Sequence, residues 1–109
     1  MSISIHKISP LKVIRGEKAW SRSIKLIANL CKKPLIIGRS TSTKKIRSTL
    51  KNDLITNNIN ALSFELDHDC CELDIQNASQ FSKRNNCDGI IAAGGGKVLD
   101  AGKLIADLL

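Results

Sequence analysis

Three consecutive glycines, Gly94, Gly95 and Gly96, stand directly before Lys97 in the stretch of sequence whose residue types best suit ligand chemistry. Glycine carries no side chain, so the backbone can take unusual dihedral angles and a ligand can approach its N–H groups closely. Where such a turn opens a helix, the free N–H groups of the first turn and the helix dipole attract anions. We therefore predict that Gly94, Gly95, Gly96 and Lys97 hold the pyrophosphate of a dinucleotide.

The segments on either side of the glycines predict a strand, a turn and a helix. The apolar run 90–93 is typical of a buried parallel strand, and apolar residues recur at helical spacing from Val98. The contiguous glycines differ from the G-x-G-x-x-G fingerprint, and Val98 stands where a Walker A loop needs Ser or Thr. By spacing alone, a tight strand-to-helix turn without a ligand explains the pattern equally well.

Strand-like and helix-like segments alternate along the whole chain. Strands are expected at 11–14, 35–37, 61–66 and 90–93, and helices from about 18, across Ile46, Leu50 and Leu54, near 72–84 and at 98–109. Leu108 and Leu109 are expected to extend the apolar side of the last helix. This alternation predicts one α/β domain, a Rossmann-like open, mostly parallel sheet with helices on both faces.

Composition indicates an ordinary globular chain of 109 residues, with 42% hydrophobic and 25% charged residues. No apolar run approaches membrane-spanning length and the amino terminus lacks a signal-peptide pattern, so we expect a cytoplasmic protein without a membrane partner. The four cysteines show neither C-x-x-C nor a paired-histidine spacing, which favours reduced thiols over a metal site.

Charge is unevenly distributed along the chain. The net charge is +7, with +11 in residues 1–55 and −4 in residues 56–109. Such asymmetry can mark a nucleic-acid surface. The basic residues are scattered, however, and aromatic residues make up 3% of the chain, so stacking platforms are scarce. We therefore expect a solvated basic surface and no nucleic-acid partner.

The motif Gly94-Gly95-Gly96-Lys97-x-x-Asp100-x-x-Lys103 resembles the signature of the glycerol dehydrogenase branch of the iron-containing alcohol dehydrogenase and dehydroquinate synthase superfamily. Residues 10–16 resemble the opening strand of that family and residues 34–37 its first nucleotide-domain strand. Residues 64–75 resemble its next strand and helix start, with Asp74 in place of the usual Glu. The resemblance spans the whole chain but covers the amino-terminal dinucleotide-binding domain of such enzymes, so we expect residues 1–109 to be a fragment without the helical metal-binding domain.

The resemblance implies a dehydrogenase that transfers a hydride between an alcohol, such as glycerol or another small polyol, and NAD or NADP. Asp100 falls where the family motif faces the substrate side of the cleft, whereas Lys103 could simply order the loop. At the position of the ribose-binding Asp stands Gly38-Arg39-Ser40, so Arg39 and Ser40 are predicted to tolerate or prefer NADP. A surface turn that contacts no cofactor explains Arg39 equally well. A divalent metal, zinc or iron, and a homo-oligomer are expected for the full-length enzyme, and no metal ligand in this part.

Two other readings remain open at this point. One is another member of the same superfamily, such as a glycerol-1-phosphate dehydrogenase or a dehydroquinate-synthase-like lyase. The other is a truncated, non-enzymatic binding module or gene remnant, for which the basic residues leave nucleic acid open as a ligand.

Overall fold

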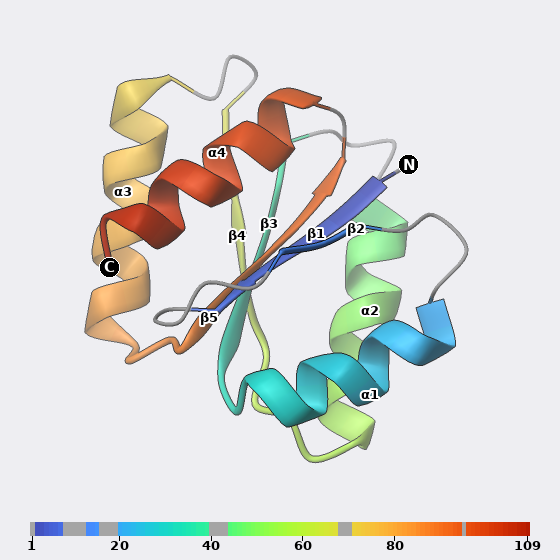
Figure 1. Cartoon of the computed structure of the whole chain (residues 1–109). Coiled ribbons are helices and arrows are strands. Elements are labelled where there is room, and N and C mark those ends of the chain that lie inside the picture. Colours follow the sequence, from blue (N-terminus) through green and yellow to red (C-terminus); the bar gives the residue numbers. More distant parts are fainter. Residues whose placement is uncertain (1, 8–12, 16–19, 40–43, 68–70, 95) are drawn as a thin grey trace.

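The computed structural model describes residues 2–7, 13–15, 20–39, 44–67, 71–94 and 96–109. These residues form strands and helices that alternate after an initial pair of strands (Figure 1). The strands are β1 (Ser2–Lys7), β2 (Val13–Arg15), β3 (Pro34–Gly38), β4 (Leu62–Glu65) and β5 (Gly89–Gly94). The helices are α1 (Trp20–Leu30), α2 (Lys44–Thr56), α3 (Glu72–Arg84) and α4 (Gly96–Asp107).

The strands form one sheet in the order β2-β1-β5-β3-β4. β3 pairs in parallel with both β4 and β5, whereas β1 pairs antiparallel with β2 and β5. The predicted Rossmann-like open α/β sheet is therefore confirmed, with an antiparallel edge that the sequence pattern did not predict. β1 itself was missed, and it places Ser2 opposite Gly94 at the end of β5.

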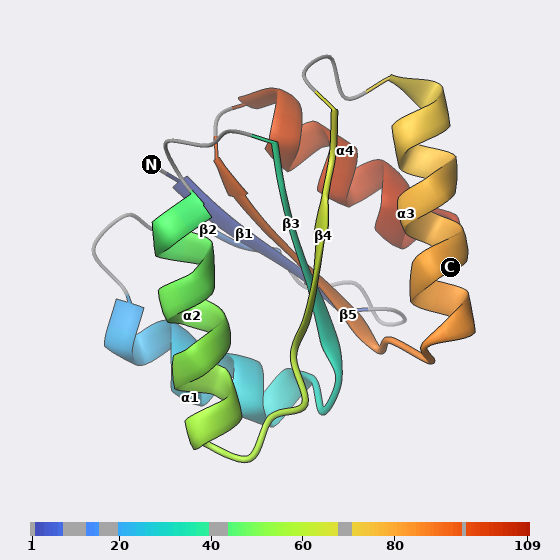
Figure 2. The ribbon, with the colours of Figure 1, turned by 180° about the vertical axis from the view of Figure 1, so that it is seen from behind.

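Two helices cover each face of the sheet (Figures 1 and 2). On one face, Ile36 and Ile91 pack with residues of α1 and α2, including Ile27 and Leu50. On the other face, the core contains side chains of β3 and β5 together with side chains of α3 and α4, namely Leu35, Ile37, Ile90, Ala92, Ala78, Val98, Ala101 and Ile105. Successive strand residues point to opposite faces, so β3 and β5 are apolar throughout and buried on both sides.

The apolar stripe predicted for α2 is wrong at one position. Leu50 and Leu54 are buried as expected, but Ile46 is 36% exposed and Arg47 is buried instead. Position 47 lies on the same helical face as positions 50 and 54, and arginine can bury its aliphatic stem while its charged end finds a partner.

The apolar side predicted for α4 is confirmed except at Leu108. Val98, Ala101 and Ile105 are buried, and Leu109 is half-buried and packs against the same core, whereas Leu108 is 51% exposed. Position 109 comes four residues after Ile105, so it stays on the side that packs on the sheet even though the helix ends at Asp107.

Asp88 joins β3 and β5 at their amino-terminal ends. Its carboxylate accepts hydrogen bonds from the backbone N–H groups of Lys32 at 2.7 Å and Lys33 at 2.9 Å. The backbone N–H of Asp88 in turn donates to the carbonyl of Lys33. This side chain satisfies backbone groups in the connection that leads from α1 into β3.

None of the helices in the described ranges is both long and apolar enough to cross a membrane. The described cysteines are reduced, with Cys31 and Cys87 buried and Cys71 exposed. Cys71 precedes α3, and its backbone N–H donates to Asp74 Oδ2 at 3.1 Å. Asp74, in the first turn of α3, thus caps the amino-terminal end of that helix.

Candidate functional site

The carboxyl ends of β3, β4 and β5 lie at the same edge of the sheet because these strands are parallel. Ile37 of β3 is level with Ala92 of β5, so the segments after Gly38 and after Gly94 leave the sheet side by side. The chain continues from β3 into α2 on one face and from β5 into α4 on the other face. In open α/β sheets, ligands bind beyond the carboxyl ends of adjacent strands whose following helices lie on opposite faces, and we refer to this place at the ends of β3 and β5 as the crevice.

The glycine turn forms the β5 side of this crevice. β5 ends at Gly94 and α4 begins at Gly96, with Gly95 outside the described residues. The strand–turn–helix unit predicted from the sequence is therefore present. The first backbone N–H groups of any α-helix have no acceptor within the helix, which makes the N-terminus of α4 suited to an anion.

A further glycine, Gly102, sets how closely α4 approaches the sheet. A Cβ at this position would lie 2.8 Å from the Cβ of Ala92 and 3.4 Å from Cδ1 of Ile37. The helix therefore packs directly on the strands that frame the crevice. This contact fixes where the glycine turn stands relative to the end of β3.

The charged residues predicted on α4 lie at its surface. Lys97, Asp100 and Lys103 are all exposed, while Val98 between them is buried. Lys97 stands in the first turn of the helix, next to the glycines. Whether Lys97 contacts a ligand, and whether Asp100 acts on the substrate side, stay predictions.

On the β3 side of the crevice, Arg39 is half-buried directly after Gly38, and Ser40 lies outside the described residues. Arg47 of α2 packs against Gly38 so closely that a Cβ at position 38 would overlap its side chain. No sequence argument identified Arg47, although its position relative to Leu50 and Leu54 placed it on the buried face of α2.

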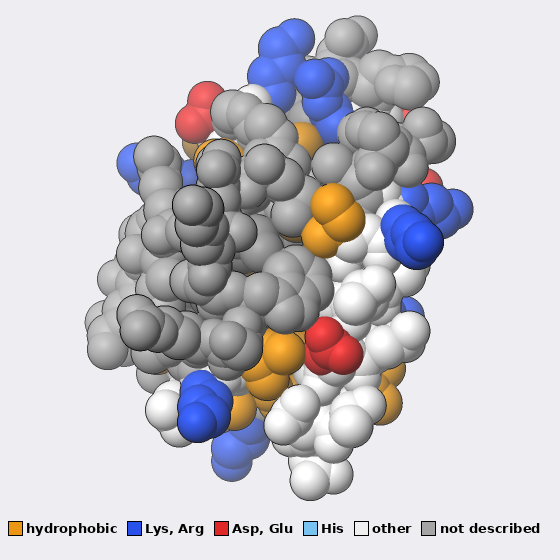
Figure 3. Space-filling model, turned by 90° about the vertical axis from the view of Figure 1, so that its right-hand side faces the viewer, with side chains coloured by type: hydrophobic (Ala, Val, Ile, Leu, Met, Phe, Trp, Pro, Cys, Tyr) orange, Lys and Arg blue, Asp and Glu red, His pale blue; other side chains and the backbone are white. Residues whose placement is uncertain are grey.

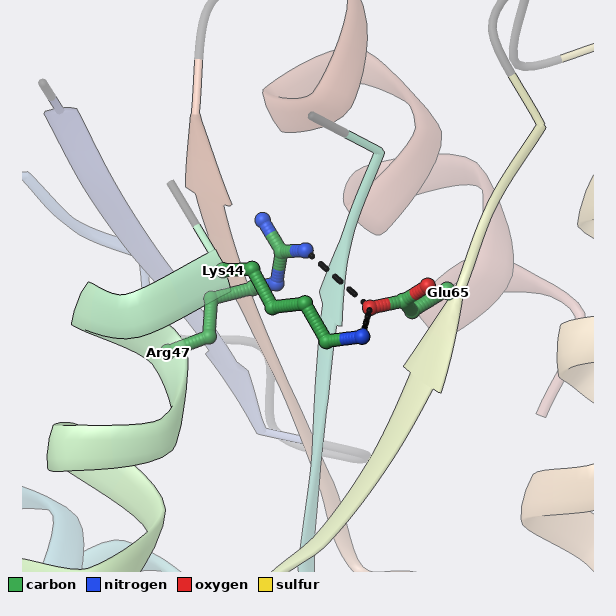
Figure 4. Close-up of polar contacts among 3 residues, drawn as sticks. All are labelled: Lys44, Arg47 and Glu65. Atoms are coloured by element: carbon green, nitrogen blue, oxygen red, sulfur yellow. Dashed lines mark ion pairs between the residues drawn. The ribbon is translucent and has the colours of Figure 1, made fainter. Parts of the chain in front are cut away.

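Glu65, at the carboxyl end of β4, joins two cations of α2 (Figure 4). Its Oε1 atom lies 3.6 Å from Lys44 Nζ and 3.6 Å from Arg47 Nη2. The Arg47 side chain is 6% exposed, whereas those of Lys44 and Glu65 are 63% and 58% exposed. The sequence analysis missed both Lys44 and Glu65, because their contact depends on the pairing of β3 with β4.

A groove of about 470 Å³ runs along α2 and β4 from this ion-pair cluster. It is lined by Lys44, Arg47, Ser48, Lys51, Asn52, Ile55, Ser63, Phe64 and Glu65. Strand β4 alternates half-buried and exposed residues, with Ser63 and Glu65 exposed. The groove is therefore lined by polar and apolar groups together, and its apolar residues are Ile55 of α2 and Phe64 of β4.

Basic side chains on the side of the molecule that carries α1 and α2 lie in separate groups (Figure 3). This arrangement agrees with the scattered placement of lysine and arginine in the first half of the sequence. The groove beside α2 brings three of these cations, Lys44, Arg47 and Lys51, to one place.

Within the described ranges, no group of three His, Cys, Asp or Glu side chains could hold a metal ion. His68 and Cys70 lie outside those ranges. Burial raises the pKa of the Cys87 thiol, and nearby Asp88 adds to the rise while Lys33 opposes it. A thiol held protonated in this way is a poor nucleophile and packs as a small apolar side chain.

Comparison with known proteins gives one positive result. The family model for iron-containing alcohol dehydrogenase matches residues 10–109, nearly the whole chain. A search of curated proteins found no match.

Proposed function

The chain belongs to the iron-containing alcohol dehydrogenase family, and we propose that residues 1–109 form the dinucleotide-binding part of a metal-dependent polyol dehydrogenase. Glycerol or a similar small alcohol is the proposed substrate, and NAD or NADP the hydride carrier. The glycerol dehydrogenase branch is supported by the motif from Gly94 to Lys103.

The observation that carries the proposal is the position of the glycine turn. It follows β5 at the point where β3 and β5 send their helices to opposite faces of the sheet. Dinucleotides bind at this point in open α/β sheets, with the pyrophosphate at a helix N-terminus. Gly94, Gly95, Gly96 and Lys97 would hold the pyrophosphate there.

The end of β3 bears on the choice between NAD and NADP. An acidic side chain after such a strand binds the ribose hydroxyls of NAD, whereas arginine favours the 2′-phosphate of NADP. Here Arg39 follows Gly38, with Ser40 next in the sequence. We therefore favour NADP as the cofactor.

When bound, the nicotinamide accepts or returns the hydride, and the protein positions it. This chain contributes backbone N–H groups at the pyrophosphate and the exposed carboxylate of Asp100 on α4. The described residues do not fit a divalent metal, so we assign no metal ligand to this part and derive no step through the metal.

The proposal is tested by measuring dissociation constants for NADH and NADPH with the protein and its Gly96→Val variant. A branched side chain at the start of α4 should obstruct the approach of the pyrophosphate and weaken binding of both dinucleotides by at least about tenfold. Lys103→Ala changes an exposed residue two turns further along α4 and is the matched control. Because we assign no metal ligand to the described residues of this part, we expect residues 1–109 alone to be inactive, and the reaction is tested by measuring glycerol oxidation with the full-length enzyme supplied with a divalent metal.

A separate variant, Arg39→Gln, tests the preference for NADP over NAD. Arg39→Gln should weaken NADPH binding and leave NADH binding within about twofold, because only NADPH carries the 2′-phosphate. Failure of the protein to bind either dinucleotide would overturn the proposed function. Tighter binding of NADH than NADPH would overturn the preference for NADP alone.

A further inference from the structure

The groove between α2 and β4 is lined by more basic than acidic side chains. Its charged lining consists, among the described residues, of Lys44, Arg47 and Lys51 against the carboxylate of Glu65. Lys44 and Arg47 approach the same carboxylate oxygen at 3.6 Å each (Figure 4). Two cations that converge on one oxygen create a position suited to an anion with several oxygens.

Arg47 is held in place before any ligand arrives. Its side chain is 6% exposed and packs against Gly38 at the end of β3. A guanidinium that is already ordered loses little conformational entropy when it binds an anion, and its planar donors match phosphate oxygens. Lys44, in contrast, is largely exposed and free to move its charge towards a ligand.

The rest of the groove suits hydroxyl groups. Beyond the cations it offers the side chains of Ser48, Asn52 and Ser63, which can both donate and accept hydrogen bonds. The volume of about 470 Å³ lies in the range of small-molecule sites. The lining also contains the apolar residues Ile55 and Phe64, which can pack against the carbon skeleton of such a molecule.

The geometry points to a phosphate-monoester site in the α2–β4 groove, with Lys44 and Arg47 as the phosphate ligands and Lys51 as a third cation. The ligand class is a phosphate carried by a small hydroxyl-bearing molecule. Glu65 competes with that phosphate for the two cations and lowers its affinity. None of its lining residues belongs to the glycine turn, so phosphate binding in the groove can be tested separately from the proposed dehydrogenase function.

The phosphate could come from two sources that share this chemistry. One is the 2′-phosphate of NADP, reaching across the end of β3 from the crevice. The other is a separate phosphorylated compound that binds in the groove alone.

The test is a titration of the isotope-labelled protein with inorganic phosphate, followed by amide NMR shifts. Shifts should appear in α2 and β4, and Lys44→Gln and Lys51→Gln should each weaken binding about three- to tenfold through loss of a charged donor. Glu65→Gln should strengthen binding about two- to threefold. Lys45→Gln removes a neighbouring exposed lysine of α2 that does not line the groove and should change affinity less than about twofold.

Competition distinguishes the two sources. If NADP displaces inorganic phosphate and NAD does not, the site holds the cofactor's 2′-phosphate; if phosphate and either dinucleotide bind together, the site serves a separate ligand. Both results support the phosphate site, and binding of phosphate without any dinucleotide affinity would count against the proposed function only. The inference is overturned if Lys44→Gln and Lys51→Gln bind phosphate as Lys45→Gln does, or if no shifts occur in α2 and β4.

Discussion

The side chain of Arg47 fills the space in which a Cβ on Gly38 would lie. This contact connects α2 to the carboxyl end of β3, beside the crevice where a dinucleotide is proposed to bind. It also aims the guanidinium of Arg47 at Glu65, 3.6 Å away on β4. The observed position of the Arg47 side chain therefore requires that residue 38 has no Cβ.

Gly38→Ala should lower the free energy of unfolding by up to about 1 kcal/mol, because the new methyl group must displace the end of the buried but flexible Arg47 side chain. Urea unfolding of the single variant measures this effect. In the Arg47→Ala background the same change should cost less than about 0.5 kcal/mol, since the obstructing side chain is gone. Equal costs in the two backgrounds would show that the overlap with Arg47 does not limit position 38.

Gly102→Ala should also destabilise the protein, although alanine favours helices over glycine by about 1 kcal/mol. The new Cβ would meet the Cβ of Ala92 at 2.8 Å, and β5 is buried on both faces and cannot move aside. Overpacking of about 1–3 kcal/mol outweighs the gain in helix propensity. Because α4 must shift, dinucleotide affinity should fall as well.

Thermal unfolding and NADPH binding of Gly102→Ala check both effects together. Lys103→Ala, at an exposed position of the same helix, should alter neither strongly. A more stable Gly102→Ala protein would contradict the close packing of α4 on β5.

Asp88→Ala should lower the free energy of unfolding by about 2 kcal/mol, because two backbone N–H groups lose a charged acceptor. Asp88→Asn should cost less, since its amide oxygen can still accept one of the bonds. Dinucleotide affinity should not change, because Asp88 directly precedes β5 and the glycine turn lies at the other end of that strand. Chemical denaturation measures the stability of the unchanged protein and of the two variants, and a binding titration measures their dinucleotide affinity. Equal stability of the three proteins would refute the proposed role of the Asp88 carboxylate.

Cys87 should make stability depend on pH in the alkaline range. Burial raises the pKa of its thiol above the ordinary value of 9.0, so the folded protein holds this proton to higher pH than the unfolded chain does. The unfolded state then loses the proton first, and the free energy of unfolding falls as the pH rises above about 9.

Urea unfolding between pH 8 and pH 10 measures this dependence. Cys87→Ala should show a shallower decline than the unchanged protein. Parallel declines for the two proteins would exclude Cys87 as the cause.

Much of the fold was predictable because its signals are local. Continuous apolar runs predicted the buried strands β3 and β5, and helical spacing predicted α1, α3 and α4 close to their observed bounds. β1 escaped prediction because Ser2, Ser4 and His6 interrupt its apolar residues, and an antiparallel partner far along the chain completes it.

Only one part of the candidate site, the glycine turn, could be predicted from the sequence. The glycine turn was identified from residue types and spacing, and its place between a strand and a helix is confirmed. The cluster of Lys44, Arg47 and Glu65 had no sequence signal, since its members meet only when α2 packs beside the pairing of β3 with β4.

The sequence by itself determined the α/β class, the strand–turn–helix unit at Gly94 and the family resemblance, because each depends on residues close together in the chain. Tertiary structure alone decided the strand order, the opposite faces taken by α2 and α4, and the groove beside β4. The physical reason is that strand pairing and helix packing bring together residues whose separation in sequence carries no periodic signal. Glu65, for example, contacts Lys44 and Arg47 because β4 and α2 lie side by side in the fold, although these residues are far apart in the sequence.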